Sequence, residues 1–265
     1  MPFANLNNIQ IAYDDQGSGS AVVLIHGFPF NRSLWNEQID ALSKSHRVIT
    51  PDLRGFGESE SSSGTATMTM MAEDIARLMD VLQIEHATLG GLSMGGYVVL
   101  AFYKQFRARV RGLVLADTRP QADTEEAKEG RTRQAERALA DGMATIADAM
   151  LPKLLTPETV AKRPSVVKRI RAMMMSTKPE GAAAALLGMA AREDQTQLLS
   201  TIDVPTLIMV GRDDAITPVQ DSQKMHERIA GSRLVILENA GHVSNIERAE
   251  KFNEELRSFL DLVVR

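Results

Sequence analysis

The sequence Ala-Thr-Leu-Gly-Gly-Leu-Ser-Met-Gly-Gly occupies residues 87–96 and places Ser93 between glycines on both sides. Its apolar beginning predicts a buried strand, and the apolar-rich run 94–106 predicts a helix. A sharp turn from strand to helix holds the residue between them in a strained conformation with its side chain exposed. Side chains two positions to either side would collide, and Gly91 and Gly95 avoid this collision. The stretch predicts a nucleophile elbow at Ser93, although a glycine-rich turn with an incidental serine has the same letters.

Alternation of strands and helices extends over most of the chain. Several predicted strands are continuous runs of Val, Ile and Leu, which are typical of strands buried on both faces by helices. The alternation predicts an α/β fold with a doubly wound, mostly parallel sheet. The predicted strands are 9–13, 21–25, 47–50, 87–89, 113–116, 206–210 and 234–237, and the predicted helices are 32–43, 69–82, 94–106, 219–229 and 248–263.

This alternation stops between residues 118 and 200, where five prolines divide a stretch rich in Ala, Glu, Arg and Met. We expect residues 118–200 to be a helical cap, inserted into a core formed by residues 1–117 and 201–265. The segment contains six of the 14 methionines, whose adaptable side chains would give an acyl pocket an apolar lining. Ordinary helix packing accounts for these methionines equally well.

A serine hydroxyl becomes a good nucleophile only when a base takes its proton, and histidine is the usual base. His242 follows a predicted strand, and the carboxyl ends of strands are where α/β sheets place their sites. His26 precedes a glycine turn and fits better as a brace for that loop. The other histidines lie at the edges of elements, where surface or packing roles are expected: His46, His86 and His226. His242 is therefore the candidate base.

The histidine in turn needs an acid that fixes its tautomer and stabilises its charged form. Asp213 and Asp214 follow a predicted strand between the serine and the histidine, which gives the chain order serine, acid, histidine. The two side chains should point in different directions, so only one is expected to serve. Asp117, at the end of another strand, is a third candidate. Each of the three also fits a strand-end or helix-capping carboxylate.

Acyl transfer also needs N–H donors for the developing oxyanion, and losing one donor typically costs about 3 kcal/mol. Residues 26–29 read His-Gly-Phe-Pro and follow a predicted strand. Gly27 is expected to permit an unusual backbone turn that points the Phe28 N–H into the site. Met94, directly after Ser93, would supply the second N–H from the start of a helix. A plain turn is the alternative interpretation of His-Gly-Phe-Pro.

Five motifs, in this order and spacing, resemble the α/β-hydrolase superfamily: HGFP, DLRGFGES, GLSMGG, GRDDAITP and AGH, at residues 26–29, 52–59, 91–96, 211–218 and 240–242. The resemblance covers nearly the whole chain, with residues 118–200 in the place of the family's variable helical cap. The chain is more closely similar to one branch of that superfamily. That branch contains small carboxylesterases, 3-oxoadipate enol-lactonases, acyl-homoserine-lactone hydrolases, and cofactor-free haloperoxidases or perhydrolases.

The resemblance implies roles for individual residues. The family pattern GxxDxxxP places its acid on Asp214, the second of the two neighbouring aspartates. Ser93 and His242 match the nucleophile and the base, and Phe28 and Met94 match the oxyanion-hole donors. The DLRGFGES segment is a structural loop in the family. Haloalkane dehalogenases and epoxide hydrolases use an aspartate nucleophile, so a serine at this position separates the chain from them.

Composition restricts the partners and the setting of the protein. The formal net charge of −4 argues against nucleic acid as a partner. The absence of cysteine excludes disulfides, thiolate zinc sites and cysteine nucleophiles, and it fits a cytoplasmic location. No secretory signal or membrane span is expected, because the apolar runs are too short. No metal-binding motif such as HExxH is present, and no metal or other cofactor is expected.

These observations predict a serine hydrolase that cleaves a small-molecule carboxylic ester or lactone through an acyl-enzyme. Candidate pocket walls are Trp35 and Leu92 near the nucleophile, and Met150 and Met174 in the cap; Trp35 fits helix packing equally well. Two rival functions stay open. One is a perhydrolase, in which hydrogen peroxide replaces water and Pro29 alters the oxyanion loop; the other is a ligand-binding receptor on the same scaffold. The sequence gives neither the acyl group nor the oligomeric state.

Overall fold

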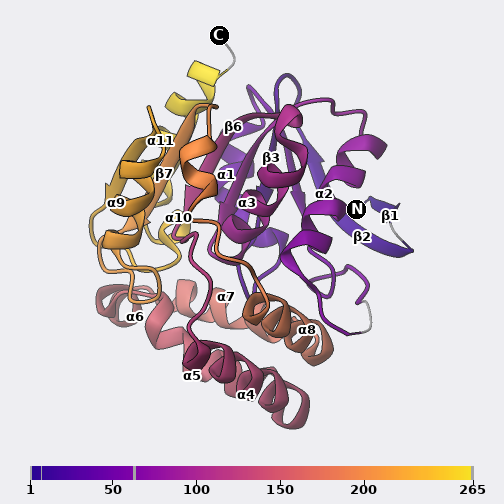
Figure 1. The fold of residues 1–265 in the computed structure, drawn as a ribbon. Coiled ribbons are helices and arrows are strands. Elements are labelled where there is room, and N and C mark those ends of the chain that lie inside the picture. The colour runs from indigo at the N-terminus through magenta and orange to yellow at the C-terminus, as the bar shows by residue number, and fades with distance from the viewer. Residues whose placement is uncertain (1, 7, 62–63, 264–265) are drawn as a thin grey trace.

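An eight-stranded sheet forms the centre of the molecule (Figure 1). The computed structural model describes residues 2–6, 8–61 and 64–263. The strand order is β1-β2-β4-β3-β5-β6-β7-β8, and every neighbouring pair from β4 to β8 is parallel. The strands are β1 (Phe3–Leu6), β2 (Ile9–Gln16), β3 (Ala21–Ile25), β4 (Arg47–Pro51), β5 (Ala87–Leu92), β6 (Val110–Ala116), β7 (Thr206–Gly211) and β8 (Arg233–Leu237).

The sheet is mostly parallel, as predicted, and its exceptions lie at one edge. Strand β2 runs antiparallel to both β1 and β4. The sequence did not predict β1, which has four residues and buries only Ala4 and Leu6. A strand this short shows too little periodicity to be recognised. It forms because the edge of β2 offers unpaired backbone groups.

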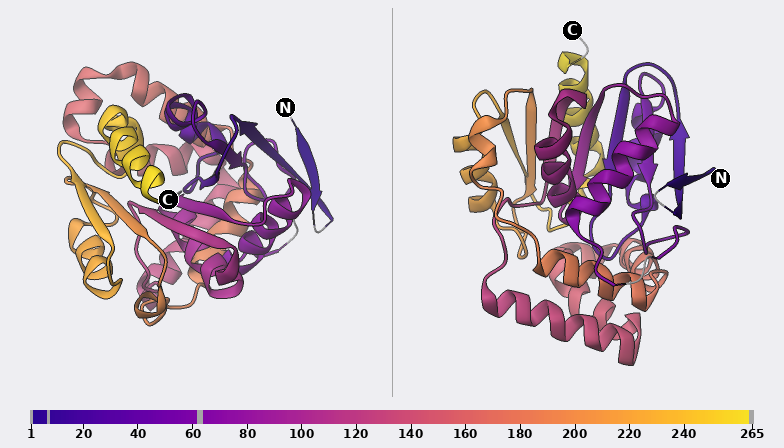
Figure 2. Two further views of the ribbon diagram at one scale, coloured as in Figure 1. Left: turned by 90° about the horizontal axis from the view of Figure 1, so that it is seen from above. Right: turned by 45° about the vertical axis from the view of Figure 1, so that its right-hand side comes forward.

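Helices cover both faces of the sheet, so the fold is doubly wound (Figure 2). On one face α2 (Met68–Val81), α3 (Met94–Phe106) and α9 (Val219–Arg228) contribute to a single apolar cluster with the strands. On the other face α1 (Asn36–Leu42) and α11 (Ala249–Val263) contribute to a second cluster. The predicted helix 32–43 divides into η1 (Arg32–Trp35) and α1, and a short helix that was not predicted, α10 (Ser244–Glu247), precedes α11.

Five helices lie between β6 and β7 and form a layer across one end of the sheet (Figures 1 and 2). We call residues 118–200 the cap. Three of its helices begin with proline, whose missing N–H would have no partner in a first helical turn. The helices are α4 (Glu125–Asp141), α5 (Met143–Leu154), α6 (Pro157–Lys162), α7 (Pro164–Met175) and α8 (Pro179–Ala190).

Helix α8 joins the cap to the core, and α4 packs on α8 from outside (Figure 1). A Cβ on Gly188 would lie 1.8 Å from Ala66 O, so only glycine permits this approach. The Ala66 N–H also donates to Ala184 O at 3.1 Å. Helix α4 buries only two of its residues, both alanines. Among the helices of the described residues, none is long and apolar enough to cross a membrane.

Candidate active site

Ser93 lies at the turn between β5 and α3 in a left-handed backbone conformation, with φ 54° and ψ −114°. A Cβ on Gly91 would lie 2.2 Å from Gly95 O, and one on Gly95 would lie 2.2 Å from a carbonyl oxygen of β3. The structure therefore requires glycine at both positions, as the sequence analysis predicted. Two hydrogen bonds hold the turn. The Ser93 N–H donates to Ala116 O (2.9 Å), and Ser93 O accepts from the Thr118 hydroxyl (2.8 Å).

The carboxyl ends of four neighbouring strands bring the candidate residues to one edge of the sheet. Strands β5, β6, β7 and β8 are adjacent and in register at these ends. Ser93, Asp117, Asp214 and His242 follow them and lie along this edge. Asp117 and Asn239 share the left-handed backbone of Ser93, with φ values of 45° and 54°. Among the described residues no hydrogen bond joins Ser93 Oγ to His242. What the structure shows is that both residues lie on the same edge of the sheet.

Asp214 and His242 form a buried pair. His242 Nδ1 lies 2.8 Å from Asp214 Oδ2, and the two residues are 1% and 5% exposed. Asp214 Oδ1 accepts the N–H groups of Ile216 (2.8 Å) and Thr217 (2.9 Å), and Oδ2 accepts the Thr217 hydroxyl (2.6 Å). Burial raises the pKa of Asp214, but His242 and these hydrogen bonds outweigh it and hold the pKa below its ordinary value. The ionised carboxylate favours the tautomer with its proton on Nδ1, which leaves the lone pair on Nε2.

The two other candidate carboxyl groups have different surroundings. Asp213 is exposed. Asp117 is fully buried, and its carboxyl group is bonded to the Gly211 N–H (2.8 Å) and to the Ser244 hydroxyl. Burial and then repulsion by Asp214 raise the pKa of Asp117 well above its ordinary value. The structure thus brings Asp214, and neither rival, against the histidine.

Residues 26–31, here called the β3 loop, lie against the elbow. A Cβ on Gly27 would lie 2.9 Å from Leu92 O and 3.3 Å from Ser93 Cβ. Gly27 is not among the described glycines with positive φ, and the Phe28–Pro29 peptide bond of the same loop is cis. Close approach to β5 is what requires glycine. The N–H groups of Phe28 and Met94 donate to no acceptor among the described residues, which leaves both donors unused beside Ser93.

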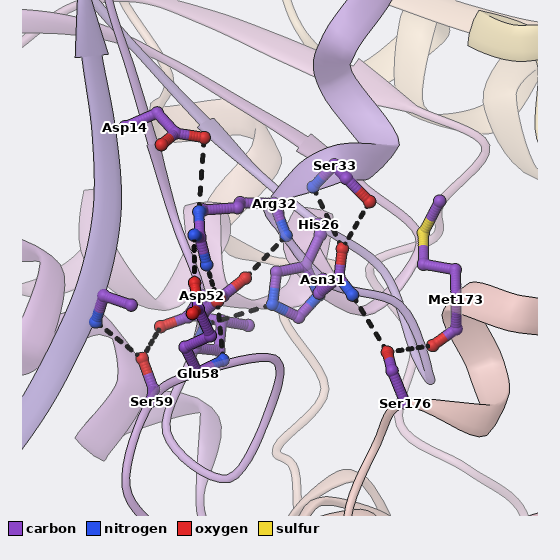
Figure 3. Close-up of polar contacts among 12 residues, drawn as sticks. Asp14, His26, Asn31, Arg32, Ser33, Asp52, Glu58, Ser59, Met173 and Ser176 are labelled. Atoms are coloured by element: carbon purple, nitrogen blue, oxygen red, sulfur yellow. Dashed lines mark hydrogen bonds and ion pairs between the residues drawn. The ribbon is translucent and has the colours of Figure 1, made fainter. Parts of the chain in front are cut away.

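Buried polar contacts fix the β3 loop (Figure 3). His26 Nε2 accepts the Leu53 N–H (3.0 Å), so Nδ1 carries the proton and donates to Gly27 O (2.9 Å). Burial lowers the pKa of His26, and a neutral ring matches the bracing role expected for it. Arg32 forms ion pairs with three acidic side chains: Asp14, Asp52 and Glu58. Because two of them frame the 52–59 loop, that loop supports the β3 loop.

On the histidine side, hydrogen bonds tie the cap to the loop that carries His242. The His242 N–H donates to Leu154 O at the end of α5 (2.9 Å). The buried Glu247 carboxylate accepts the Gly241 N–H (2.6 Å) and the Thr156 hydroxyl (2.8 Å). One carboxylate therefore joins the histidine loop to the cap.

On the opposite side, the cap reaches the β3 loop. The Thr177 hydroxyl donates to Pro29 O (2.9 Å), and the Asn31 side chain donates to Ser176 Oγ (3.1 Å; Figure 3). Both cap residues lie in the short connection between α7 and α8. The cap is thus bonded to the loop that carries Phe28 as well as to the histidine loop.

The four predicted pocket residues lie in unlike places. Trp35 is fully buried with its ring centre 6.1 Å from that of Phe252, so it packs between η1 and α11. Leu92 is fully buried directly before the nucleophile candidate. Met174 is fully buried in the second apolar cluster, and the half-buried Met150 contacts both clusters. Their role in binding a substrate stays a prediction.

Sequence reasoning missed Thr217 and Glu247. The Thr217 hydroxyl also lies 3.3 Å from His242 Nδ1. The sequence Asp-Ala-Ile-Thr contains a usable signal, because an aspartate often accepts backbone N–H groups two and three residues later. Glu247 gives no such signal, because its partner Thr156 is 91 residues away in the chain. Among the described residues, no group of three or more His, Cys, Asp or Glu side chains is arranged to hold a metal ion.

Known proteins similar to this chain match it over almost its full length. The family model described as the alpha/beta hydrolase fold matches residues 20–249. The 3-oxoadipate enol-lactonase 2 of Acinetobacter baylyi is 29% identical over 245 residues, which cover 92% of this chain and 90% of that protein. A thermophilic esterase from Thermogutta terrifontis, solved with malate bound, is 45% identical with a TM-score of 0.96, and the match covers 97% of this chain and 95% of that one. The enol-lactonase from Burkholderia xenovorans LB400 is 32% identical with a TM-score of 0.92, covering 98% and 100%.

Proposed function

Because the chain belongs to the α/β hydrolase fold family, we propose that it is a serine hydrolase that cleaves carboxylic esters or lactones. One observation carries the proposal: the buried Asp214–His242 pair, joined at 2.8 Å, lies on the sheet edge where Ser93 occupies its strained elbow. Relatives named esterase and enol-lactonase, matched over almost their whole length, support an ester or a lactone as the substrate.

In the proposed mechanism, His242 Nε2 accepts the hydroxyl proton as Ser93 Oγ attacks the carbonyl carbon. Asp214 holds the ring and stabilises the imidazolium that forms. His242 then gives the proton to the leaving alcohol, and Ser93 stays acylated. Water, deprotonated by the same histidine, attacks the acyl group and releases the acid. In a lactone the leaving alcohol stays attached to the acyl group, so ring opening yields a hydroxy acid or, from an enol lactone, a keto acid.

The tetrahedral oxyanion is assigned to the N–H groups of Phe28 and Met94. Both lack another acceptor among the described residues, and Met94 is the first residue of α3, where helix N–H groups are free and the dipole favours an anion. The braced β3 loop holds the Phe28 donor in place before the charge develops. Such preorganisation lowers the barrier, because no reorientation is needed during the reaction.

The experiment is a hydrolysis panel of p-nitrophenyl esters of increasing acyl length, together with simple lactones, on the purified full chain. Ser93→Ala should remove nearly all turnover while the melting temperature and circular dichroism stay those of a folded protein. A fluorophosphonate probe should label the native chain once and should not label the variant. Turnover or labelling that persists in the variant would contradict the assignment of Ser93. A native chain that is labelled but hydrolyses nothing in the panel would favour the receptor.

A further inference from the structure

A cleft lies along α3 at the boundary between core and cap, starting one helical turn beyond Ser93. Its volume is about 340 Å³, and its walls come from the start of α2, from the middle and end of α3, from residues 119–120, and from the end of α8 with the residues after it. A volume of this order is at the small end for a ligand site. The cleft would therefore hold a small molecule.

The walls of the cleft carry unbalanced positive charge. Lys104 is paired with Glu193 at 2.6 Å, so these two charges cancel. Arg119 and Arg192 also line the cleft. Both form ion pairs with Asp123, a buried carboxylate, at 3.2 Å from Arg119 and 2.8 Å from Arg192. Asp123 also pairs with Arg131. Three guanidinium groups thus share one carboxylate.

The charge balance of this cluster does not change by protonation at neutral pH. Burial raises the pKa of Asp123, but hydrogen bonds from Arg192 and Arg131 outweigh it and lower the pKa to about 2. The carboxylate therefore stays ionised at neutral pH. Arginine is always protonated under the same conditions. An anionic ligand is the species that this environment favours.

Donors for such an anion are held in place. Arg192 is 8% exposed, and its guanidinium lies 4.2 Å from the Tyr97 ring centre while donating to Met189 O (2.9 Å) and Gln121 O (2.8 Å). The Nε–H groups of both Arg192 and Arg119 are buried without a hydrogen-bond partner among the described residues. Buried donors are rarely left unpaired. Arg192 contributes fixed positive charge, and the donors within reach of a ligand are those of the Arg119 side chain, which is 29% exposed and bonds only through Nη2, to Asp123, among the described residues. A guanidinium of this kind matches a carboxylate oxygen.

The remainder of the lining selects the body of the ligand. Met68, Leu100 and Pro120 give the cleft an apolar side, which suits a short carbon chain and disfavours a bare inorganic ion. Tyr97 also lines the cleft, with the Arg192 guanidinium over its ring.

We propose that this cleft is a second binding site, separate from the Ser93 centre, for a small carboxylate with a short carbon chain, held by Arg119 and Arg192. The site is independent of the proposed hydrolysis, because none of the proposed catalytic residues lines it. A bound ligand would touch both α3 of the core and α8 of the cap. Occupancy should therefore raise the melting temperature.

Calorimetric titration of the full chain with succinate, at low ionic strength and with neutral succinamide as comparison, tests the site. Succinate should bind at least tenfold more tightly than succinamide and should raise the melting temperature. Arg119→Gln should weaken succinate binding at least tenfold, with hydrolysis of p-nitrophenyl acetate unchanged. Arg131→Gln is the matched control: it removes a cation from the same carboxylate but not from the cleft, so binding should change less than threefold.

Blocking Ser93 with a fluorophosphonate distinguishes the cleft from the proposed active site. Succinate should bind the blocked protein as it binds the native one. Loss of binding on blocking would place the ligand at Ser93 and overturn the proposal. Equal binding of succinate and succinamide, or equal effects of Arg119→Gln and Arg131→Gln, would also overturn it, as would inorganic phosphate binding as tightly as succinate.

Discussion

The carboxyl edge of the sheet is strained, whereas the cap above it is relaxed. At the edge, Ser93, Asp117 and Asn239 adopt left-handed backbone although none is glycine. Among the described residues of the cap, only Gly142 has positive φ, and glycine adopts it without a steric penalty. Strain of this kind costs on the order of 1–3 kcal/mol per residue and persists only where the surroundings enforce it. The comparison shows that the surroundings enforce unfavourable backbone conformations at the edge and not in the cap.

The two regions also differ in the side chains that hold them. Both contain backbone contacts so close that only glycine fits, at Gly91 and Gly95 on the edge and at Gly188 in the cap. The cap depends in addition on single side chains that reach far along the chain, such as Thr177 to Pro29 across 148 residues. If this contrast is right, changes at the edge should abolish turnover, and changes in the cap should reduce it or redirect it.

Asp214→Asn should give the largest effect among the changes that follow. The amide keeps the shape but leaves the histidine in the wrong tautomer, so kcat should fall on the order of 10⁴-fold. The measurement is kcat on the best p-nitrophenyl ester, with melting temperature as a check on folding.

Two neighbouring carboxyl groups serve as controls for that loss. Asp213 is exposed, so Asp213→Asn should leave kcat within a few-fold of the native value. The pKa of Asp117 is raised by burial and by Asp214, so Asp117→Asn replaces a group that favours its neutral form and should cost far less than 10⁴-fold. A larger loss in either control than in Asp214→Asn would show that the acid is misassigned.

Glu247→Gln tests whether the cap supports the chemistry. The amide cannot accept from both Gly241 N–H and Thr156 as the carboxylate does, and losing a charged acceptor costs about 1.5–3 kcal/mol. We expect kcat to fall roughly 10–100-fold, with little change in KM. Glu250→Gln, at an exposed position three residues later in the chain, is the control. A variant with a lower melting temperature but the native kcat would show that this contact stabilises the fold and does not contribute to turnover.

The contrast between edge and cap also explains what sequence could predict. The parallel sheet, the elbow and the position of His242 follow from local patterns: apolar runs, paired glycines and residues just after strands. Strand β1 was not predicted, because four residues are too few to show a clear alternation of apolar and polar side chains. The choice between Asp213 and Asp214 needed a family resemblance, because two adjacent aspartates have the same local signal. The role of Glu247 could not be predicted from the sequence, because its partner Thr156 is brought close to it only by folding.

Asp123 provides a pH-dependent test of cap stability. Its pKa is lowered from 3.8 to about 2 by Arg192 and Arg131, against the opposing effect of burial. A depressed pKa stabilises the fold above the unfolded-state value and loses that contribution as pH falls towards the folded value. The shift corresponds to about 2 kcal/mol at neutral pH. Asp123→Asn should therefore lower the melting temperature by roughly 5 °C at neutral pH.

The difference between the Asp123→Asn variant and the native chain should shrink as pH falls from about 4 towards 2. Thermal melts of both proteins across this range provide the measurement. Asp194→Asn, in the same part of the cap but with its carboxylate bonded mainly to Thr196, is the comparison and should show a smaller gap. A gap that is constant with pH would mean that packing, and not the ion cluster, is what the substitution removes.

The smallest expected effect concerns substrate choice, and it separates the cap from the core most finely. Met150 is half-buried and touches both apolar clusters, whereas Met174 is fully buried within the second cluster. Met150→Phe should change the ratio of rates on hexanoate and acetate esters by about fivefold, since a methylene in an apolar pocket is worth about 1 kcal/mol at the low end. Met174→Leu keeps the volume and should change this ratio less. Met175 is 40% exposed, so Met175→Phe is the matched control and should leave the ratio unchanged.

Acetate hydrolysis should survive in all three variants, because the edge stays intact. If no cap substitution alters the ranking of esters, then selectivity resides in the core beside Leu92 and Trp35, and the cap supports the site without choosing the substrate.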